Sequence, residues 1–534
     1  MDDENSLLEH TCKLNFTEPA SHYRLTGVIG TVSKASRSLQ VLRKMIRTGM
    51  TIVRLNFSHE THELHAETIR LLHNVEEEYS KEMGYTIQLA IALDTKGPEI
   101  RTGLLEAGPN SQVELKVNDS VRLSINRDLM DKGNRECIFV DYENIINVVQ
   151  PGNFVYINDG SLKFIVKEVG VDCVTCQVER GGMLGSRKKI NLPGVSVDLP
   201  AVSKKDVNDL KFALEHKIDF IFASSMRNAS AVKEVRSLLG DQGKYVKIIA
   251  KIDCEQGLHN VDEIISVADG ILFASADIAI EINNAKVFLA QKAVMARCNR
   301  AGKPVIVATK LLESMRYSIF PTKAEFSDLG NAILDGADCV MLSSETAIGQ
   351  FPSESIAYMC DICREAELAL WNRHMFEDLL LRNPTSLDAA HSMAIAAVDA
   401  AKKSSACAIV VLTASGKSSY LLAKYRPGCP ILAVTKCPRT FRQSHLYRGV
   451  IPVMYTEITQ KRWLNEVDAR VQFCMNVANR MNIIKSGDSV VILSPWKNDG
   501  GFTNTMRLVY AFFEQEDIDG MCKTDRKSTK KLKV

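Results

Sequence analysis

No apolar run in the sequence approaches the roughly 18 residues that a membrane-spanning helix requires. A surplus of charge of one sign is also missing, because 66 lysines and arginines stand against 64 aspartates and glutamates, for a net charge of +2. Such a balance gives no electrostatic basis for binding nucleic acid or a membrane surface. The acidic start of the chain lacks the basic and then apolar order of a signal peptide. We therefore expect a cytoplasmic protein that binds neither nucleic acid nor membrane.

The sequence also lacks a cysteine pattern that indicates chemistry. Its 14 cysteines are expected to be reduced thiols, because a chain without a secretion signal folds in a reducing compartment. Two pairs have the spacing Cys-x-x-Cys, Cys173 with Cys176 and Cys360 with Cys363. Neither has a second pair at the spacing of a zinc site, nor the setting of a thioredoxin motif. We interpret both pairs as structural.

What the sequence does have is length and an ordinary balance of residue types. Its 534 residues suggest three or four domains of about 150 residues, one of which could be a barrel of about 250. Hydrophobic residues make up 46% and charged residues 24%, which is typical of soluble globular proteins. This composition excludes disorder or a fibrous fold for most of the chain.

Short apolar segments rich in valine and isoleucine recur along the first two-thirds of the chain, alternating with helical patterns. We expect eight strands, at residues 27–32, 51–57, 87–94, 220–224, 247–253, 270–275, 304–309 and 339–345. Helical periodicity falls at residues 38–49, 62–78, 204–216, 284–300 and 353–370. Eight β–α units in series indicate a parallel barrel or a doubly wound sheet, and the number eight favours the (β/α)₈ TIM barrel.

Two regions depart from the barrel pattern. Between the third and fourth strands, β-like segments alternate with turns, which predicts a β-barrel lid domain inserted at the catalytic face. Near residue 372 the alternation of strands and helices restarts, which predicts a separate C-terminal α/β domain. The expected domains are an arm at 1–23, the barrel at 24–96 and 200–371, the lid at 97–199, the α/β domain at 372–511, and a disordered basic tail at 512–534.

Polar side chains gather at the carboxyl ends of the expected strands, which form the catalytic face of a barrel. They are Arg54, Asn56, Ser58, Asp94, Thr95, Lys251, Asp253, Asp277, Thr309, Ser343 and Glu345. Lys251 and Asp253 are two residues apart on one strand and therefore share a face. Asp253 and Asp277, in oxygen-rich surroundings, suit Mg²⁺. Because Arg54, Lys251 and Arg101 would offset phosphate charge, the set predicts a phosphoryl-transfer site.

Six motifs resemble those of pyruvate kinase, and they occur in that family's order. They are Arg54-Leu-Asn-Phe-Ser-His59, Leu93-Asp-Thr-Lys-Gly-Pro-Glu-Ile-Arg-Thr-Gly103, Asn191-Leu-Pro-Gly194, Asn299-Arg-Ala-Gly-Lys-Pro304, Leu312-Glu-Ser-Met315 and Leu334-Asp-Gly-Ala-Asp338. The likeness runs from about residue 24 to residue 510. It implies transfer of phosphate from phosphoenolpyruvate to ADP, giving pyruvate and ATP in glycolysis, with Mg²⁺ and K⁺ as cofactors. It also implies a homotetramer.

The resemblance implies a role for each matching residue. Arg54 and Lys251 would act on the transferring phosphate, and Thr309 would organise the proton donor. These three residues, with Ala276 and Asp277, would form the substrate site. The implied Mg²⁺ ligands are Asp253 and Asp277, the implied nucleotide contacts are Asn56, His59, Arg101 and Lys188, and the implied K⁺ ligands are Asn56, Ser58, Asp94 and Thr95.

Several positions depart from the family's pattern. Ala276 stands where a glycine is usual, so its N–H is available to the substrate carboxylate only if its φ is negative. Asp253 stands where a glutamate is usual, which shortens the metal-binding arm by one methylene, and a bridging water would fill the gap. Glu60 replaces a glycine and adds negative charge near the ADP phosphates, and its expected partner is Lys34.

These departures leave three functions open. A working pyruvate kinase is favoured because Arg54, Lys251, Asp277 and Thr309 are retained together with the whole set of K⁺ ligands. A catalytically impaired paralogue that serves as a ligand-binding or regulatory subunit is the main alternative. The third is another enzyme of the phosphoenolpyruvate and pyruvate barrel group, such as a lyase, but the full-length lid and C-terminal domain argue against it.

A loop in the C-terminal domain, Leu412-Thr-Ala-Ser-Gly-Lys-Ser-Ser419, follows a strand and precedes a helix, so its N–H groups could hold a phosphate. It is not a Walker loop, because Val411 stands where that motif requires glycine. It resembles the sugar-bisphosphate effector loop of pyruvate kinases, which implies activation by fructose 1,6-bisphosphate. The implied effector residues are Thr413, Ser415, Gly416, Ser418, Trp463, Arg470 and Gly501.

Overall fold

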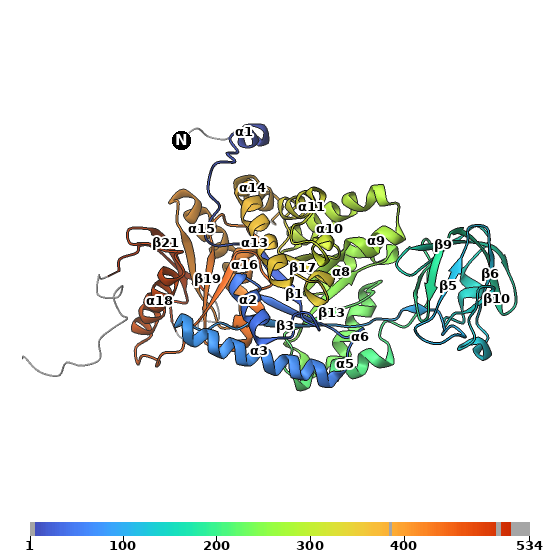
Figure 1. The fold of residues 1–534 in the computed structure, drawn as a ribbon. Helices are drawn as coiled ribbons and strands as arrows, with labels where there is room; N and C mark the ends of the chain where they lie inside the picture. The colour runs from blue at the N-terminus through green and yellow to red at the C-terminus, as the bar shows by residue number, and fades with distance from the viewer. Residues whose placement is uncertain (1–5, 384–386, 498–502, 514–534) are drawn as a thin grey trace, which may run out of the picture.

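The computed structural model describes residues 6–383, 387–497 and 503–513, and Figure 1 shows its three parts in a row. The C-terminal α/β domain lies at one end, the barrel in the middle and the inserted lid at the other end. A short helix, α1 (Leu7–Cys12), precedes the barrel. Within the described ranges, no helix is both long and apolar enough to cross a membrane.

Eight parallel strands close into a barrel in the order β1-β17-β16-β15-β14-β13-β3-β2, which confirms the predicted (β/α)₈ architecture. Every residue of β1, β3, β13, β15, β16 and β17 is buried, because strands in a barrel are covered on both faces. The bounds are β1 (Gly27–Thr31), β2 (Ile52–Asn56), β3 (Ala90–Asp94), β13 (Phe220–Ala223), β14 (Lys247–Ile252), β15 (Gly270–Ala274), β16 (Val305–Ala308) and β17 (Cys339–Leu342).

Eight helices surround the barrel, and several begin at a polar cap that the sequence supplies. Ser203 and Asp206, for example, form a reciprocal capping box at the start of α5. The bounds are α2 (Leu39–Thr48), α3 (His62–Met83), α5 (Lys204–Glu215), α6 (Ala229–Leu239), α8 (Val261–Val267), α10 (Val287–Ala301), α11 (Lys323–Leu334) and α13 (Pro352–Leu368). The short helices α7 (Glu255–His259), α9 (Ser275–Glu281) and α12 (Ser344–Ala347) follow β14, β15 and β17.

Two hydrophobic cores position the catalytic face. One lies between the strands and the surrounding helices and includes Leu55, Ile221 and Leu329. The other fills the barrel interior and continues into the C-terminal domain, so that Phe220 and Leu446 belong to the same core. The C-terminal domain therefore covers the amino ends of the strands, and the carboxyl ends face the lid.

The lid is a mainly β insertion between β3 and β13, with a seven-stranded sheet ordered β4-β12-β8-β9-β10-β6-β7 and a two-stranded pair of β11 with β5. Strands β4, β7, β11 and β12 are short, with two to four residues each. The bounds are β4 (Ile100–Arg101), β5 (Gln112–Leu115), β6 (Ser120–Ser124), β7 (Cys137–Phe139), α4 (Ile145–Val148), β8 (Phe154–Ile157), β9 (Leu162–Val169), β10 (Cys173–Arg180), β11 (Gly182–Gly185) and β12 (Lys189–Asn191).

The C-terminal domain has a five-stranded sheet ordered β20-β19-β18-β21-β22. Four of these strands are parallel, as the alternation of strands and helices predicts, and the edge strand β22 is antiparallel. The bounds are α14 (Asn372–Leu381), α15 (Ala389–Lys403), β18 (Ala408–Leu412), α16 (Lys417–Lys424), β19 (Ile431–Thr435), α17 (Pro438–Ser444), β20 (Val450–Met454), α18 (Trp463–Arg480), β21 (Ser489–Ser494) and β22 (Thr505–Tyr510). The expected basic tail lies outside the described residues, apart from its first two positions.

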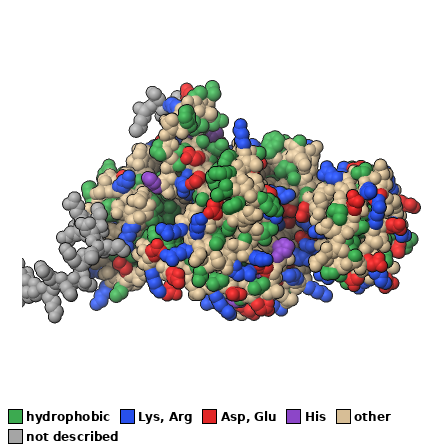
Figure 2. All heavy atoms as spheres, viewed as in Figure 1, with side chains coloured by type: hydrophobic (Ala, Val, Ile, Leu, Met, Phe, Trp, Pro, Cys, Tyr) green, Lys and Arg blue, Asp and Glu red, His purple; other side chains and the backbone are tan. Residues whose placement is uncertain are grey.

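The surface agrees with the balanced charge of the sequence. On the face shown in Figure 2, basic and acidic side chains are interspersed over the barrel and the lid. The described cysteines are all free thiols. Cys173 and Cys176 lie on β10, and Cys360 and Cys363 on α13. Among described His, Cys, Asp and Glu residues, no group of three or more is arranged to hold a metal ion.

Candidate active site

A polar cavity of about 330 Å³ opens between the carboxyl ends of the barrel strands and the lid. It brings together most of the site residues that the sequence indicated. These are Arg54, Asn56, Ser58, His59, Asp94, Thr95, Arg101, Lys188, Lys251, Asp253 and Asp277. Strands β2, β3 and β14 and the residues directly after them supply the barrel residues, α9 supplies Asp277, and the lid supplies the other two.

Lys251 lies between two carboxylates at the centre of this cavity. Its Nζ is 4.0 Å from Asp253 Oδ2 and 3.9 Å from Asp277 Oδ2. Burial alone would lower the pKa of Lys251, but the carboxylates of Asp277, Asp94 and Asp253 raise it above its ordinary value. The lysine is therefore held in its charged form, ready to balance further negative charge.

Asp253 carries an unusual free oxygen. Its Oδ2 accepts hydrogen bonds from the N–H and the hydroxyl of Ser225, at 3.1 and 3.2 Å. Its Oδ1 is buried and has no hydrogen-bond partner among the described residues. Burial raises the pKa of Asp253. A buried carboxylate oxygen without a partner is costly unless a cation or a water binds it, so the donor set fits a hard divalent ion.

The pKa of Asp277 is shifted in the opposite direction from that of Asp253. Burial alone would raise its pKa, but the nearby charges of Lys251, Lys189 and Arg54 lower it. Its carboxylate is therefore ionised at neutral pH.

Arg54 and Asp94 form a buried pair where β2 and β3 run side by side. The Arg54 Nε donates to Asp94 Oδ2 at 2.6 Å, and Nη1 donates to Thr31 Oγ1 at 3.0 Å. The hydroxyl of Ser224 donates to the other Asp94 oxygen at 3.2 Å. These contacts fix the guanidinium at the cavity wall, where Asn56, Ser58 and Thr95 add further oxygen atoms.

Ala276 and Thr309 meet beside the cavity. Ala276 lies in the first turn of α9 with a right-handed helical backbone, so the condition of a negative φ is met. Its N–H donates to Thr309 Oγ1 at 2.9 Å, and the Thr309 hydroxyl donates to the Ala308 carbonyl at 2.6 Å. Thr309 has a φ of 76°, which is rare for a β-branched residue and occurs mainly where the surrounding structure enforces it.

Glu60 has a different partner from the one expected. Its carboxylate pairs with the guanidinium of Arg37 and accepts a hydrogen bond from the Ser33 hydroxyl at 2.7 Å. The expectation of a pair with Lys34 is wrong. Arg37 lies three residues after Lys34, just before α2 begins, and its guanidinium reaches Glu60. The sequence alone did not indicate which of the two basic residues would face Glu60.

The lid contributes cations through the paired strands β4 and β12. Arg101 on β4 lies opposite Lys189 on β12, and its Nε donates to Glu99 at 2.9 Å. The Lys189 Nζ lies 3.7 Å from Asp277 Oδ1. Sequence reasoning missed Lys189, although it directly follows Lys188, because a three-residue strand is too short to show which of its side chains face the barrel. Both lysines line the cavity.

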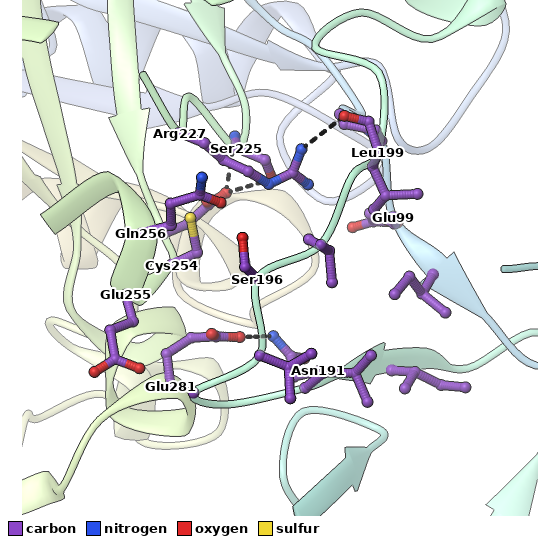
Figure 3. Close-up of a pocket in the computed structure, with 18 of the residues that line it drawn as sticks. Glu99, Asn191, Ser196, Leu199, Ser225, Arg227, Cys254, Glu255, Gln256 and Glu281 are labelled. Carbon is purple, nitrogen blue, oxygen red and sulfur yellow. Dashed lines mark hydrogen bonds between the residues drawn. The ribbon is translucent and has the colours of Figure 1, made fainter. Parts of the chain in front are cut away.

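A second hollow, of about 410 Å³, lies at the same interface, lined by residues of the segment 189–199 that leads from the lid back to the barrel (Figure 3). We call it the hinge hollow. The Asn191 amide donates to Glu281 at 2.6 Å and the Arg227 guanidinium donates to the Leu199 carbonyl at 3.3 Å, so both bonds join lid segments to the barrel. Lys189 and Asp253 line both this hollow and the active-site cavity.

The described members of the expected effector set lie on or beside α16 and α18 of the C-terminal domain, which Figure 1 shows at the opposite end of the molecule from the lid. Gly416 has a φ of 84° at the start of α16, and an added Cβ would lie 2.3 Å from the Tyr420 ring, so glycine is required there. Its N–H donates to Thr413 Oγ1 at 3.0 Å. Ser415 lies beside it on the same turn.

Two hydrogen bonds hold described residues of the expected effector set. Thr503 donates its hydroxyl hydrogen to Ser418 Oγ at 2.8 Å, and the Trp463 indole donates to the Pro495 carbonyl at 3.1 Å. Arg470 is held by Glu466, with its Nε 2.8 Å from Oε1. The remaining expected residue, Gly501, lies outside the described residues.

Comparisons with known proteins agree along most of the chain. The family models described as "Pyruvate kinase, barrel domain" and "Pyruvate kinase, alpha/beta domain" match residues 23–356 and 391–509. The chain is 46% identical to the human protein named Pyruvate kinase PKLR over 505 residues, which cover 95% of this chain and 88% of the relative. It is 43% identical to the pyruvate kinase of Schizosaccharomyces pombe over 494 residues, covering 91% of this chain and 95% of the relative. The chain therefore belongs to the pyruvate kinase family.

Proposed function

We propose that this phosphotransferase moves the phosphoryl group of phosphoenolpyruvate to ADP, giving pyruvate and ATP in glycolysis. The observation that carries the proposal is the cavity in which Arg54 and Lys251 meet Asp253 and Asp277 in a chain of this family. It joins cationic side chains for phosphate oxygens to carboxylates for a metal ion, as phosphoryl transfer requires.

Arg54 and Lys251 have separate electrostatic tasks in this scheme. Arg54, fixed by Asp94, presents its guanidinium to the transferring phosphate as a preorganised donor. Lys251, charged and central, neutralises negative charge as the bond from phosphorus to the enol oxygen breaks and a bond to the ADP oxygen forms. Both groups act in a water-poor site, where their interactions are stronger than in solvent.

Asp253 and Asp277 would hold Mg²⁺, and the free Oδ1 of Asp253 supports this assignment. When bound, this ion would neutralise negative charge on the phosphate during the transfer. Asn56, Ser58, Asp94 and Thr95 would hold K⁺ through their oxygen atoms, since all of them line the same cavity.

Thr309 and Ala276 would handle the carbon skeleton of the substrate. The Ala276 N–H, now bonded to Thr309 Oγ1, would turn to the substrate carboxylate, which frees the hydroxyl of Thr309. Thr309 then orients the proton donor toward the enolate carbon that becomes the methyl group of pyruvate. Asn56 and His59 from the barrel, with Arg101 and Lys188 from the lid, would bind the nucleotide.

Two observations support the alternative of a catalytically impaired paralogue. The side chain of Asp253 is short for a metal ligand, and the Ala276 N–H is bonded to Thr309 Oγ1 and so is not free for the substrate. An assay with purified protein, Mg²⁺, K⁺, phosphoenolpyruvate and ADP, coupled to lactate dehydrogenase, decides between the two. We expect pyruvate formation that Lys251→Met abolishes. Absent turnover together with intact binding of phosphoenolpyruvate would favour the paralogue.

The regulatory and cellular proposals rest on the same family relationship. The turn around Gly416 would bind one phosphate of fructose 1,6-bisphosphate, and a thermal-shift titration that finds no stabilisation would contradict this.

A homotetramer is supported by edge strand β22, whose Met506, Leu508 and Tyr510 are exposed. Size-exclusion chromatography with light scattering tests that assembly. As a glycolytic enzyme, the protein would act in the cytoplasm.

A further inference from the structure

Each carboxylate oxygen of Asp277 faces an ammonium group of its own. Lys251 from the barrel approaches Oδ2 at 3.9 Å, and Lys189 from the lid approaches Oδ1 at 3.7 Å. The side chains of Lys189 and Asp277 are each only 22% exposed, so little water screens their attraction. Lys189 thus joins the lid to a carboxylate of the barrel.

We propose that Lys189 is a lid-borne counter-ion that competes with the divalent cation for Asp277 and so lowers the metal affinity of the substrate-free protein. This inference deepens the proposed function, because it rests on Asp253 and Asp277 as the metal ligands. An ammonium and a metal ion cannot both approach Asp277 Oδ1 closely without strong mutual repulsion.

The charges at the centre of the site support this competition. Two carboxylates, Asp253 and Asp277, face two ammonium groups, Lys251 and Lys189, so these four charges balance one another before any ligand binds. A neutral cluster attracts a divalent cation weakly. The phosphate of a bound substrate would add the negative charge that the cation needs, which couples metal binding to substrate binding.

The position of Lys189 explains why this charge belongs to the lid. It lies opposite Arg101 on paired strands and two residues from Asn191, which is bonded to the barrel. Lys189 also lines both the active-site cavity and the hinge hollow, so a small shift of the lid would carry its ammonium away from Asp277. A shift of the lid that moves Lys189 away would therefore open Asp277 to the metal ion.

Direct binding of Mn²⁺ to the full-length protein, followed by electron paramagnetic resonance of free Mn²⁺ without substrates, tests the inference. We expect Lys189→Met and Lys189→Gln to bind Mn²⁺ about ten-fold more tightly than the wild type, from the Coulomb repulsion that is removed. Lys189→Arg, which keeps the charge, should bind like the wild type. The matched control is Lys163→Met, which removes a lid lysine that pairs with Glu179 away from the cavity, and its Mn²⁺ affinity should not change.

Unchanged or weaker Mn²⁺ binding in both uncharged Lys189 variants would overturn the inference, as would an equal gain in Lys163→Met. A thermal unfolding midpoint near that of the wild type shows that each variant is folded. If neither wild type nor variants bind Mn²⁺, the inference also fails. The proposed function is judged separately, by formation of pyruvate from phosphoenolpyruvate in the wild type.

Discussion

At the scale of single residues, the backbone of Thr309 is the most informative feature. Its φ of 76° and the φ of 55° at Lys310 place two successive side-chain-bearing residues in the left-handed region. Such a conformation costs on the order of 1–3 kcal/mol for each residue and is typical of functional sites. The hydrogen bonds to Ala276 and Ala308 hold Thr309 in this state and aim its hydroxyl.

We expect Thr309→Ala to lower kcat for pyruvate formation by about 100-fold, because it removes the hydroxyl that we propose orients the proton donor. Thr309→Ser keeps the hydroxyl and should retain most of the activity. Steady-state kinetics of both variants measure the difference. Equal activity of the alanine and serine variants would remove Thr309 from the proton-transfer step.

Glu76, on α3, is a second residue with a measurable signature. Its Oε1 accepts a hydrogen bond from the Leu89 N–H at 2.7 Å, and burial raises the pKa of Glu76 from 4.5 to about 7, despite the nearby charge of Arg442. Because the folded protein binds this proton more tightly than the unfolded chain, the stabilisation is complete below pH 4.5 and is lost as the pH rises through about 7.

Glu76→Gln, which can still accept the Leu89 hydrogen bond, should therefore be more stable than the wild type at pH 8. The upper limit of the gain is roughly 3 kcal/mol, and it should shrink toward pH 5. Thermal unfolding midpoints of both proteins between pH 5 and pH 8 provide the measurement. A difference that stays constant over this range would show that Glu76 titrates normally.

At the scale of elements, the lid is attached to the barrel by a few directed bonds. Asn191 at the end of β12 donates to Glu281 at the end of α9, beside the hinge hollow (Figure 3). Burial raises the pKa of Glu281. The bond therefore satisfies a carboxylate that is poorly solvated, and its loss should loosen the lid.

Asn191→Ala should raise the KM for ADP several-fold and speed amide hydrogen exchange in residues 189–199. The reason is that the lid loses its hydrogen bond to Glu281 of the barrel, which is worth about 1–3 kcal/mol. Glu281→Gln keeps an acceptor for the Asn191 amide and is the matched control. Kinetics and hydrogen exchange followed by mass spectrometry are the measurements. Exchange rates that match the wild type would mean that the bond does not hold the lid.

Comparison with the sequence shows which elements are predictable. All eight barrel strands were expected, because buried parallel strands form continuous apolar segments bounded by polar residues. β4 and β12 have two and three residues, too few to show any period, so the pairing of Arg101 with Lys189 could not be foreseen. The partner of Glu60 was missed for a similar reason, because Arg37 reaches it through the fold. The expected domain boundaries stay predictions.

At the scale of the whole molecule, one buried cluster joins the barrel to the C-terminal domain. Asp338, directly before β17, accepts hydrogen bonds from Arg426 Nη2 at 2.9 Å and from the Arg448 N–H at 3.2 Å. The side chains of Asp338 and Arg426 are 5% and 6% exposed. Removing one partner of such a pair leaves the other as an unpaired buried charge.

Asp338→Ala should lower the free energy of unfolding by about 3–5 kcal/mol, because Arg426 remains buried without its carboxylate. Asp361→Ala removes a carboxylate that pairs with Arg364 at the surface, and this control should change stability by less than about 1 kcal/mol. Denaturant unfolding of both variants gives the comparison. Similar losses in the two variants would contradict a special role for the buried cluster.

The insertion of the lid has a consequence for how the protein is made. β3 and β13 are hydrogen-bonded neighbours in the barrel, yet the whole lid lies between them in the chain. During synthesis, the β1, β2 and β3 segment therefore leaves the ribosome well before its partner strand exists, and β3 has an unpaired edge that can pair with other chains. Early folding of the lid would shorten the distance that the chain must close and so protect this edge. The inserted domain would thus also help the newly made chain to fold.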